Sequence, residues 1–160
     1  MDGRKNMTAI PPAIHTIANL IDEHHAAQPD EPRLHLGGSV LGHPCERWLW
    51  LSFRWAVREK FPGRIRRLFR RGNNEENIIT NDLKAIGIDI NSTGEKQRFI
   101  KFGSHVGGSV DGIIESGVPG AEKTRHIAEY KTHALKSFND LEKKGVKDSK
   151  PMHWAQMQVY

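Results

Sequence analysis

Cysteine is almost absent from this sequence of 160 residues, which holds a single one, Cys45. One cysteine excludes an intramolecular disulfide and any cysteine-rich zinc site within the chain. Long hydrophobic runs are also missing, because Pro11, Pro12, His15 and Asp22 interrupt the apolar residues near the N-terminus. The sequence therefore predicts neither a signal peptide nor a membrane span, and a reducing cytoplasm is the expected location.

The composition is that of an ordinary globular protein with an excess of positive charge. Hydrophobic residues make up 37% of the chain and charged residues 27%, and 24 Lys and Arg stand against 19 Asp and Glu, which gives a formal charge of +5. The length fits one domain with a single core. The excess of basic residues favours polyanionic partners such as nucleic acids, and it carries no information about the fold.

Helical periodicity dominates the first half of the sequence. Helices are expected over 11–27 and 44–57, and the density of Trp and Phe in the second predicts burial on more than one face. A longer helix is expected over 63–87, with Gly87 as its C-terminal stop. Its apolar stripe consists of Ile65, Leu68, Ile79, Leu83 and Ile86. Glu76 falls in phase with this stripe, so a carboxylate is expected to face the core.

After Gly87 the hydrophobic period changes to two, which is typical of strands. Four strands, separated by the turn sequences NSTG and SGVPG, are expected over 88–92, 96–102, 105–115 and 125–131. A helix is then expected over 134–144, ending at Gly145. One face of this helix carries Leu135, Phe138 and Leu141. A last helix is expected to begin at Pro151.

Two short stretches combine acidic and basic residues, GGSVDGII at 107–114 and HIAEYKTH at 126–133. Side chains alternate across a strand, so Glu129 and Lys131 are expected on the same face of the second stretch. Antiparallel pairing of the two stretches would place Asp111 beside Glu129. Two carboxylates and one amine would then converge on one patch.

Carboxylates at such close range repel one another unless a cation joins them. Their hard oxygens select Mg²⁺ or Mn²⁺, ions that polarise a phosphoryl group, lower the pKa of a bound water and stabilise a leaving oxygen. Lys131 is expected to orient that water or to stabilise charge on the phosphate, and Glu76 to supply a further carboxylate. The opposing interpretation is that Asp111, Glu129 and Lys131 are ordinary polar residues in a surface ion pair.

At these positions the sequence resembles the PD-(D/E)XK nuclease superfamily, in particular its RecB-like branch with the phage exonucleases similar to lambda exonuclease. Four motifs carry the resemblance: Gly72-x-x-x-Glu76 for GxxxE, Ser109-x-Asp111-Gly112 for SxDG, Glu129-x-Lys131 for ExK, and Gln156-x-x-x-Tyr160 for QxxxY. Each motif is weak alone, and the four in the family's order are strong together. Val110 stands in place of the proline of the family name, at a position that varies in the superfamily.

The resemblance implies an α/β (α+β) fold with a restriction-endonuclease-like αβββαβ core, in which helices flank a mixed central sheet and extra helices precede it. An N-terminal helix and loop would occupy 1–38 and a nuclease domain 39–160, with 63–87 as the first core helix. The sequence ends at Tyr160 inside an uncapped apolar helical run. We therefore expect a C-terminal truncation that removes the last strand of the core.

The resemblance also implies a metal centre with two Mg²⁺ ions, for which Mn²⁺ can substitute. Asp111 would bridge the two ions. Glu129 and the carbonyl group of Tyr130 would hold one of them, and Glu76 would contribute directly or through a metal-bound water. These four residues are the expected metal ligands.

Further residues are expected around this centre. Gln156 and Tyr160, one turn apart on the same helical face, would steer Lys131 or the DNA backbone. The residues expected to contact DNA phosphate are Ser109, Arg47, Arg67 and Arg70. Two alternatives stay open, because Arg47 could instead be a helix-end ion-pair partner and the arginine run over 63–71 a solvated helix face.

Cys45, the tryptophans and the histidines have structural interpretations. Cys45 with Arg47 is similar to nucleases that bind an iron–sulfur cluster through one early and three late cysteines, but a buried structural cysteine is the preferred interpretation. Trp48, Trp50 and Trp55 are expected in the core rather than as base-stacking platforms. The nine histidines show no recognised spacing of zinc ligands.

The functional hypothesis is a Mg²⁺-dependent DNA exonuclease of the phage recombination type, which acts on duplex ends in the cytoplasm of the host. Its partners would be DNA, a single-strand annealing protein and further copies of the chain. Two alternatives stay open: an endonuclease on the same core, and a catalytically silent DNA-binding or assembly module.

Overall fold

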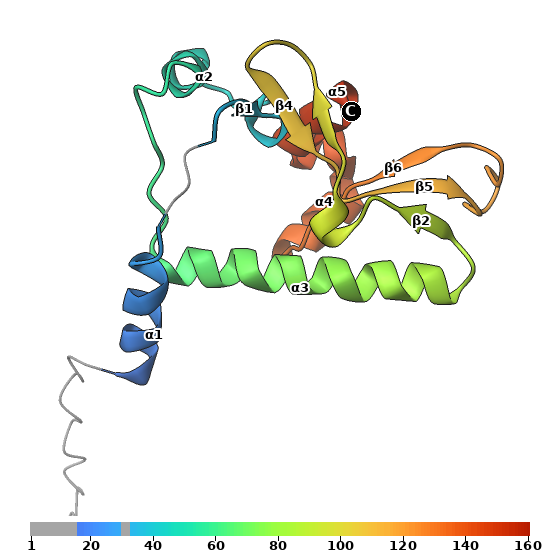
Figure 1. The fold of residues 1–160 in the computed structure, drawn as a ribbon, viewed down its shortest axis with the longest axis horizontal. Coiled ribbons are helices and arrows are strands. Elements are labelled where there is room, and N and C mark those ends of the chain that lie inside the picture. The colour runs from blue at the N-terminus through green and yellow to red at the C-terminus, as the bar shows by residue number, and fades with distance from the viewer. Residues whose placement is uncertain (1–15, 30–32) are drawn as a thin grey trace, which may run out of the picture.

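A computed structural model describes residues 16–29 and 33–160 (Figure 1). Its helices are α1 (Ile17–Ala26), α2 (Glu46–Phe53), α3 (Gly63–Ala85), α4 (Leu135–Ser149) and α5 (Pro151–Val159). Its strands are β1 (Leu36–Gly37), β2 (Asp89–Asn91), β3 (Phe99–Lys101), β4 (Val106–Ser109), β5 (Gly112–Ser116) and β6 (His126–Ala128). Single 3-10 turns lie at Gly38–Val40 and Gly94–Lys96. The mixed content of helices and strands confirms the expected α+β class at a coarse level.

The described strands form two three-stranded sheets instead of one central sheet, in the orders β1–β4–β3 and β2–β5–β6. β1 runs parallel to β4, and the other pairs are antiparallel. The expectation of one strand over 105–115 is wrong, because the chain leaves the first sheet after Ser109 and enters the second at Gly112. Val110, between them, is fully buried, and its backbone N–H donates to the carbonyl oxygen of Arg98 at 3.1 Å.

The helix boundaries follow local chain signals closely. Gly87 has a φ of 87°, which favours glycine, and α3 ends two residues before it. Gly145, with a φ of 73°, interrupts the helical backbone where the helix over 134–144 is expected to end, and a further turn continues to the end of α4. Pro151 is the first residue of α5, as expected. The first part of the helix expected over 11–27, up to residue 15, lies outside the described residues.

The buried apolar side chains belong mainly to the second sheet, and they are Ile90, Val110, Ile113 and Ala128. α3 crosses beside this sheet (Figure 1), and the hydroxyl of its buried Thr80 donates to the phenol oxygen of Tyr130 at 3.4 Å. The expected apolar stripe of α3 is mostly exposed, since Leu68 is 51% and Ile86 75% accessible. The face of α3 toward the sheet is instead defined by Glu76 and Thr80, one turn apart.

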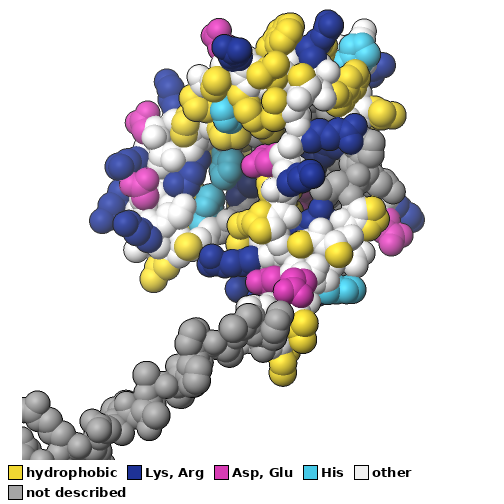
Figure 2. All heavy atoms as spheres, turned by 90° about the vertical axis from the view of Figure 1, so that its left-hand side faces the viewer, with side chains coloured by type: hydrophobic (Ala, Val, Ile, Leu, Met, Phe, Trp, Pro, Cys, Tyr) yellow, Lys and Arg dark blue, Asp and Glu magenta, His cyan; other side chains and the backbone are white. Residues whose placement is uncertain are grey.

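Trp50 of α2 and Trp55, just after it, contradict the expectation of burial. Trp50 and Trp55 are 59% and 45% exposed, and no residue of α2 is buried. The reason is that α2 lies to one side of the two sheets (Figure 1). Hydrophobic side chains accordingly gather on the upper part of the face that Figure 2 shows, with basic side chains around them. Among the described residues, no helix is both long and apolar enough to cross a lipid bilayer.

The apolar face of α4 is exposed, since Leu135 and Phe138 are 75% and 51% accessible. The expectation that Cys45 is buried is wrong. Cys45 is exposed because it precedes the first turn of α2, where its sulfur accepts a hydrogen bond from the backbone N–H of Trp48 at 3.4 Å. Its role is therefore that of a helix cap at the surface.

Candidate metal centre

Asp111 lies at the break between β4 and β5, where the chain passes from one sheet to the other. β5 and β6 pair antiparallel with Gly112 opposite Ala128, so Asp111 and Glu129 follow as neighbours at the same end of the two strands. This arrangement confirms the expected pairing. The backbone N–H of Tyr130 donates to Asp111 Oδ2 at 2.7 Å, which fixes the orientation of the carboxylate.

Glu129 and Lys131 lie just beyond the end of β6, which stops at Ala128. The expectation that both belong to a strand is therefore wrong. They are nevertheless brought together, because Lys131 Nζ donates to Glu129 Oε1 in an ion pair. The side chain of Glu129 is 15% exposed and that of Lys131 32% exposed. The glutamate is therefore the more buried partner of a pair whose lysine reaches solvent.

Glu76 projects from α3 toward the same end of the second sheet, and Gln97 connects it to Asp111. The side-chain amide of Gln97 donates to Glu76 Oε2 at 3.5 Å and to Asp111 Oδ1 at 3.4 Å. Gln97 directly follows the 3-10 turn Gly94–Lys96, which aims it between the two carboxylates. No sequence pattern singles out Gln97, which is one polar residue of an expected strand.

Burial and mutual repulsion act on the carboxylates of this cluster. Burial, and then the neighbouring carboxylates of Asp111 and Glu129, raise the pKa of Glu76, while the Lys131 ammonium opposes the change. Burial also raises the pKa of Glu129, and Asp111 adds to this effect against the hydrogen bonds from Lys131 and Gln156. Glu76, Asp111 and Glu129 therefore lie within electrostatic range of one another, although they come from three separate segments.

α5 closes one side of the cluster. Gln156, 3% exposed, donates from its amide nitrogen to Glu129 Oε1 at 2.8 Å, so it acts on the glutamate and holds its orientation. The hydroxyl of Tyr160 donates to the carbonyl oxygen of Ser109 at 3.3 Å, and burial raises the pKa of that phenol. A Cβ atom at Gly108 would collide with the Tyr160 hydroxyl. Glycine at this position therefore makes room for the tyrosine.

The residues expected to contact phosphate lie on three different elements, α2, α3 and β4. Ser109 is exposed and lies two residues before Asp111. Arg67 forms an ion pair with Asp22 of α1 at 2.9 Å, which neutralises its charge and ties α1 to α3. Arg47 on α2 and Arg70 on α3 are exposed, and neither forms an ion pair with a described carboxylate. Of the four, Ser109 is the one that lies beside the carboxylates in the chain.

Carboxylate oxygens are the ligands that a hard divalent cation prefers, but the described His, Cys, Asp and Glu side chains do not form a group of three or more ligands. Glu129 Oε2 and Gln156 Oε1 are buried without a hydrogen-bond partner among the described residues. Burying an unpaired carboxylate oxygen is costly, and a cation would remove that cost. The side-chain nitrogens of Gln97 and Lys131 donate to the carboxylate oxygens, which are the atoms that would also attract a cation.

Comparisons with known proteins give no relative. No protein-family model matches the chain, and no curated protein and no solved structure does so either. The chemistry of the site is therefore inferred from its own residues and their geometry.

Proposed function

We propose that this chain carries the catalytic centre of a metal-dependent phosphodiesterase that acts on nucleic acid. The observation that carries the proposal is the convergence of Glu76, Asp111 and Glu129 from three segments, with Lys131 alongside. Three carboxylates within electrostatic range of one another favour a hard divalent ion, and an ammonium beside them favours a phosphate. The formal charge of +5 supports a polyanionic substrate.

More specifically, we propose a Mg²⁺-dependent DNA exonuclease of the phage recombination type. The support is the resemblance to the PD-(D/E)XK nucleases, whose four motifs supply the residues of this cluster. Asp111 and Glu129 come from the SxDG and ExK motifs, and Gln156 from the QxxxY motif contacts Glu129 directly. Glu76 of the GxxxE motif reaches Asp111 through the Gln97 amide.

A divalent ion held by Asp111, Glu129 and Glu76, with the Tyr130 carbonyl as a further ligand, would supply an activated water and stabilise the leaving oxygen. The protein's own groups prepare this chemistry. The Tyr130 N–H fixes the Asp111 carboxylate, and the Gln156 amide fixes that of Glu129. Lys131, already at the edge of the cluster, provides positive charge for an attacked phosphate.

The exonuclease proposal is tested with end-labelled linear duplex and covalently closed circular DNA, each incubated with the protein in Mg²⁺ and in EDTA. We expect the linear duplex to be degraded in Mg²⁺ while the circle stays intact, because an exonuclease needs an end. Cleavage of the circle would replace this proposal with an endonuclease. Salt-dependent DNA binding without Mg²⁺-stimulated cleavage of either substrate would support the catalytically silent binding module instead.

The pKa of Glu76 predicts how the stability of the fold changes with pH. Its pKa is raised above the ordinary 4.5, mainly by burial, so the metal-free folded chain binds this proton more tightly than the unfolded chain. Stability from this group is therefore present below pH 4.5 and is lost as the pH rises through the folded-state pKa. Glu76→Gln removes the ionisable group. We expect it to raise the thermal midpoint at pH 7 in EDTA by roughly 2 °C, with the difference vanishing toward pH 4.

Scanning calorimetry at both pH values measures this effect. Glu75→Gln is the matched control, because Glu75 lies on the same helix but forms an ion pair with Arg71 at 3.7 Å instead of joining the cluster. A Glu76→Gln midpoint at pH 7 that equals or falls below the wild-type value would contradict the repulsion inferred for the cluster.

A further inference from the structure

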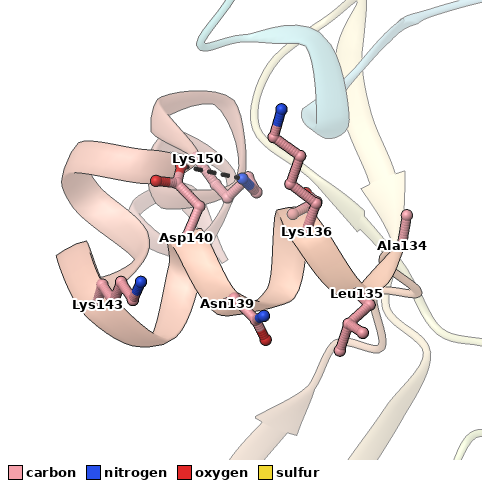
Figure 3. A pocket seen from close by; sticks show the side chains of 8 residues that line it. Ala134, Leu135, Lys136, Asn139, Asp140, Lys143 and Lys150 are labelled. Atoms are coloured by element: carbon pink, nitrogen blue, oxygen red, sulfur yellow. Dashed lines mark ion pairs between the residues drawn. The ribbon is translucent and has the colours of Figure 1, made fainter.

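A hollow on the surface beside α4 has a strongly basic lining. It has a volume of about 890 Å³ and lies between the first half of α4 and the junction of α4 with α5 (Figure 3). Three lysines contribute to its lining, Lys136, Lys143 and Lys150, together with the carboxylate of Asp140. The hollow belongs to no part of the proposed metal centre, and none of its residues appears in the four motifs.

Asp140 neutralises only part of this charge. Its Oδ1 pairs with Lys144 Nζ at 2.8 Å and its Oδ2 lies 4.0 Å from Lys150 Nζ. In Figure 3 the side chain of Lys136 extends away from the ion pair between Asp140 and Lys150. Lys136 and Lys143 are both exposed, and neither forms an ion pair within 4.0 Å among the described residues. Three lysines and one carboxylate in the lining leave the hollow with a formal surplus of two positive charges.

The hollow lies near the proposed metal centre along the chain. Ala134, which lines the hollow, follows Lys131 by three residues, which span at most about 11 Å between their Cα atoms. The ring of His133, the residue before Ala134, lies 5.4 Å from that of His153. After burial, the charges of Lys131, His133 and Lys150 lower the pKa of His153, so this histidine lies within electrostatic range of Lys131 and of Lys150.

We propose that the hollow beside α4 binds the phosphate backbone of the nucleic-acid strand whose bond lies at the metal centre. The inference rests on the proposed function. A strand advances about 3.4 Å per nucleotide along a duplex, so a span of at most about 11 Å from Lys131 to Ala134 lets a strand of a few nucleotides reach from the cluster to the hollow. Lysine side chains suit this task because, as flexible point charges, they attract phosphates independently of base sequence.

The experiment measures the salt dependence of DNA binding in EDTA, so that cleavage plays no part. The affinity of the wild type and of the double variant Lys136→Gln/Lys143→Gln for a labelled duplex is followed by fluorescence anisotropy at several salt concentrations. Lys84→Gln/Lys123→Gln is the matched control, with the same loss of charge at two exposed lysines outside the hollow. Thermal unfolding confirms that all three proteins fold, since exposed substitutions of this kind change stability little.

Loss of two phosphate contacts should reduce the slope of log affinity against log salt by about 1.8. We expect this reduction in the Lys136→Gln/Lys143→Gln variant and an almost unchanged slope in the control. Equal slopes in all three proteins would overturn the inference, and continued Mg²⁺-dependent cleavage by the wild type would show that the proposed function survives. If the wild-type protein neither binds nor cuts DNA, both this inference and the proposed function are wrong. The double variant could instead lose binding to phosphatidylserine vesicles while its salt slope for DNA stays unchanged. That result would also overturn the inference, in favour of an anionic lipid surface as the partner of the hollow.

Discussion

Replacement of Asp111 by asparagine is expected to lower the rate of Mg²⁺-dependent DNA cleavage by roughly three orders of magnitude. Asp111 is the carboxylate that lies between the other two, in contact with Gln97 and in electrostatic range of Glu76 and Glu129. Removing its charge leaves too little negative charge to hold a divalent ion. Asparagine still offers a side-chain oxygen to the Tyr130 N–H, so the local fold should persist.

The rate is measured by single-turnover cleavage of an end-labelled duplex, with thermal unfolding as the test of folding. Glu115→Gln is the matched control, because Glu115 lies on β5 near Asp111 in the sequence but pairs with Arg125 at 2.8 Å and with Asn91. The control should cleave at nearly the wild-type rate. Wild-type cleavage by a folded Asp111→Asn protein would remove Asp111 from the reaction.

Lys131→Met is expected to lower the cleavage rate by about two to three orders of magnitude while leaving metal binding intact or stronger. Lys131 donates to Glu129, so its ammonium competes with a cation for that carboxylate. Methionine keeps the apolar length of the side chain and removes the charge. Metal affinity and cleavage should therefore respond in opposite directions, a separation that a purely structural lysine would not produce.

Cleavage rates at saturating Mg²⁺ and the Mg²⁺ concentration for half-maximal rate measure the two effects. Lys131→Arg keeps the charge and should recover part of the rate, and Lys123→Met, in the β5–β6 turn, is the control for loss of an exposed lysine. A Lys131→Met protein that loses metal binding together with cleavage would indicate that the lysine only supports the shape of the site.

The sequence predicted those structural elements that are determined by residues close together in the chain. Gly87 and Gly145 both adopt positive φ and end helical segments where their positions indicated. The turn between β5 and β6 and the antiparallel register also follow from the sequence, and they bring Asp111 and Glu129 together. Each of these features is set by residues within about one turn or one hairpin of the site.

The features that sequence reasoning missed depend on contacts between distant segments. Gln97 reaches Glu76 and Asp111, 21 and 14 residues away, so no local pattern could reveal its position. The division of 105–115 into strands of two sheets depends on burial of Val110 and on pairing with partners far along the chain. Likewise, the aromatic residues of α2 are hydrophobic enough for a core, but the helix lies beside the sheets (Figure 1).

Titration of the protein with Mn²⁺, followed by the electron paramagnetic resonance signal of the free ion, tests whether Glu76, Asp111 and Glu129 share a divalent cation. We expect the wild type, Glu115→Gln and Lys131→Met to bind Mn²⁺, and Asp111→Asn to bind it at least tenfold more weakly. Equal Mn²⁺ affinity in the wild type and a folded Asp111→Asn protein would show that these carboxylates do not form a metal centre.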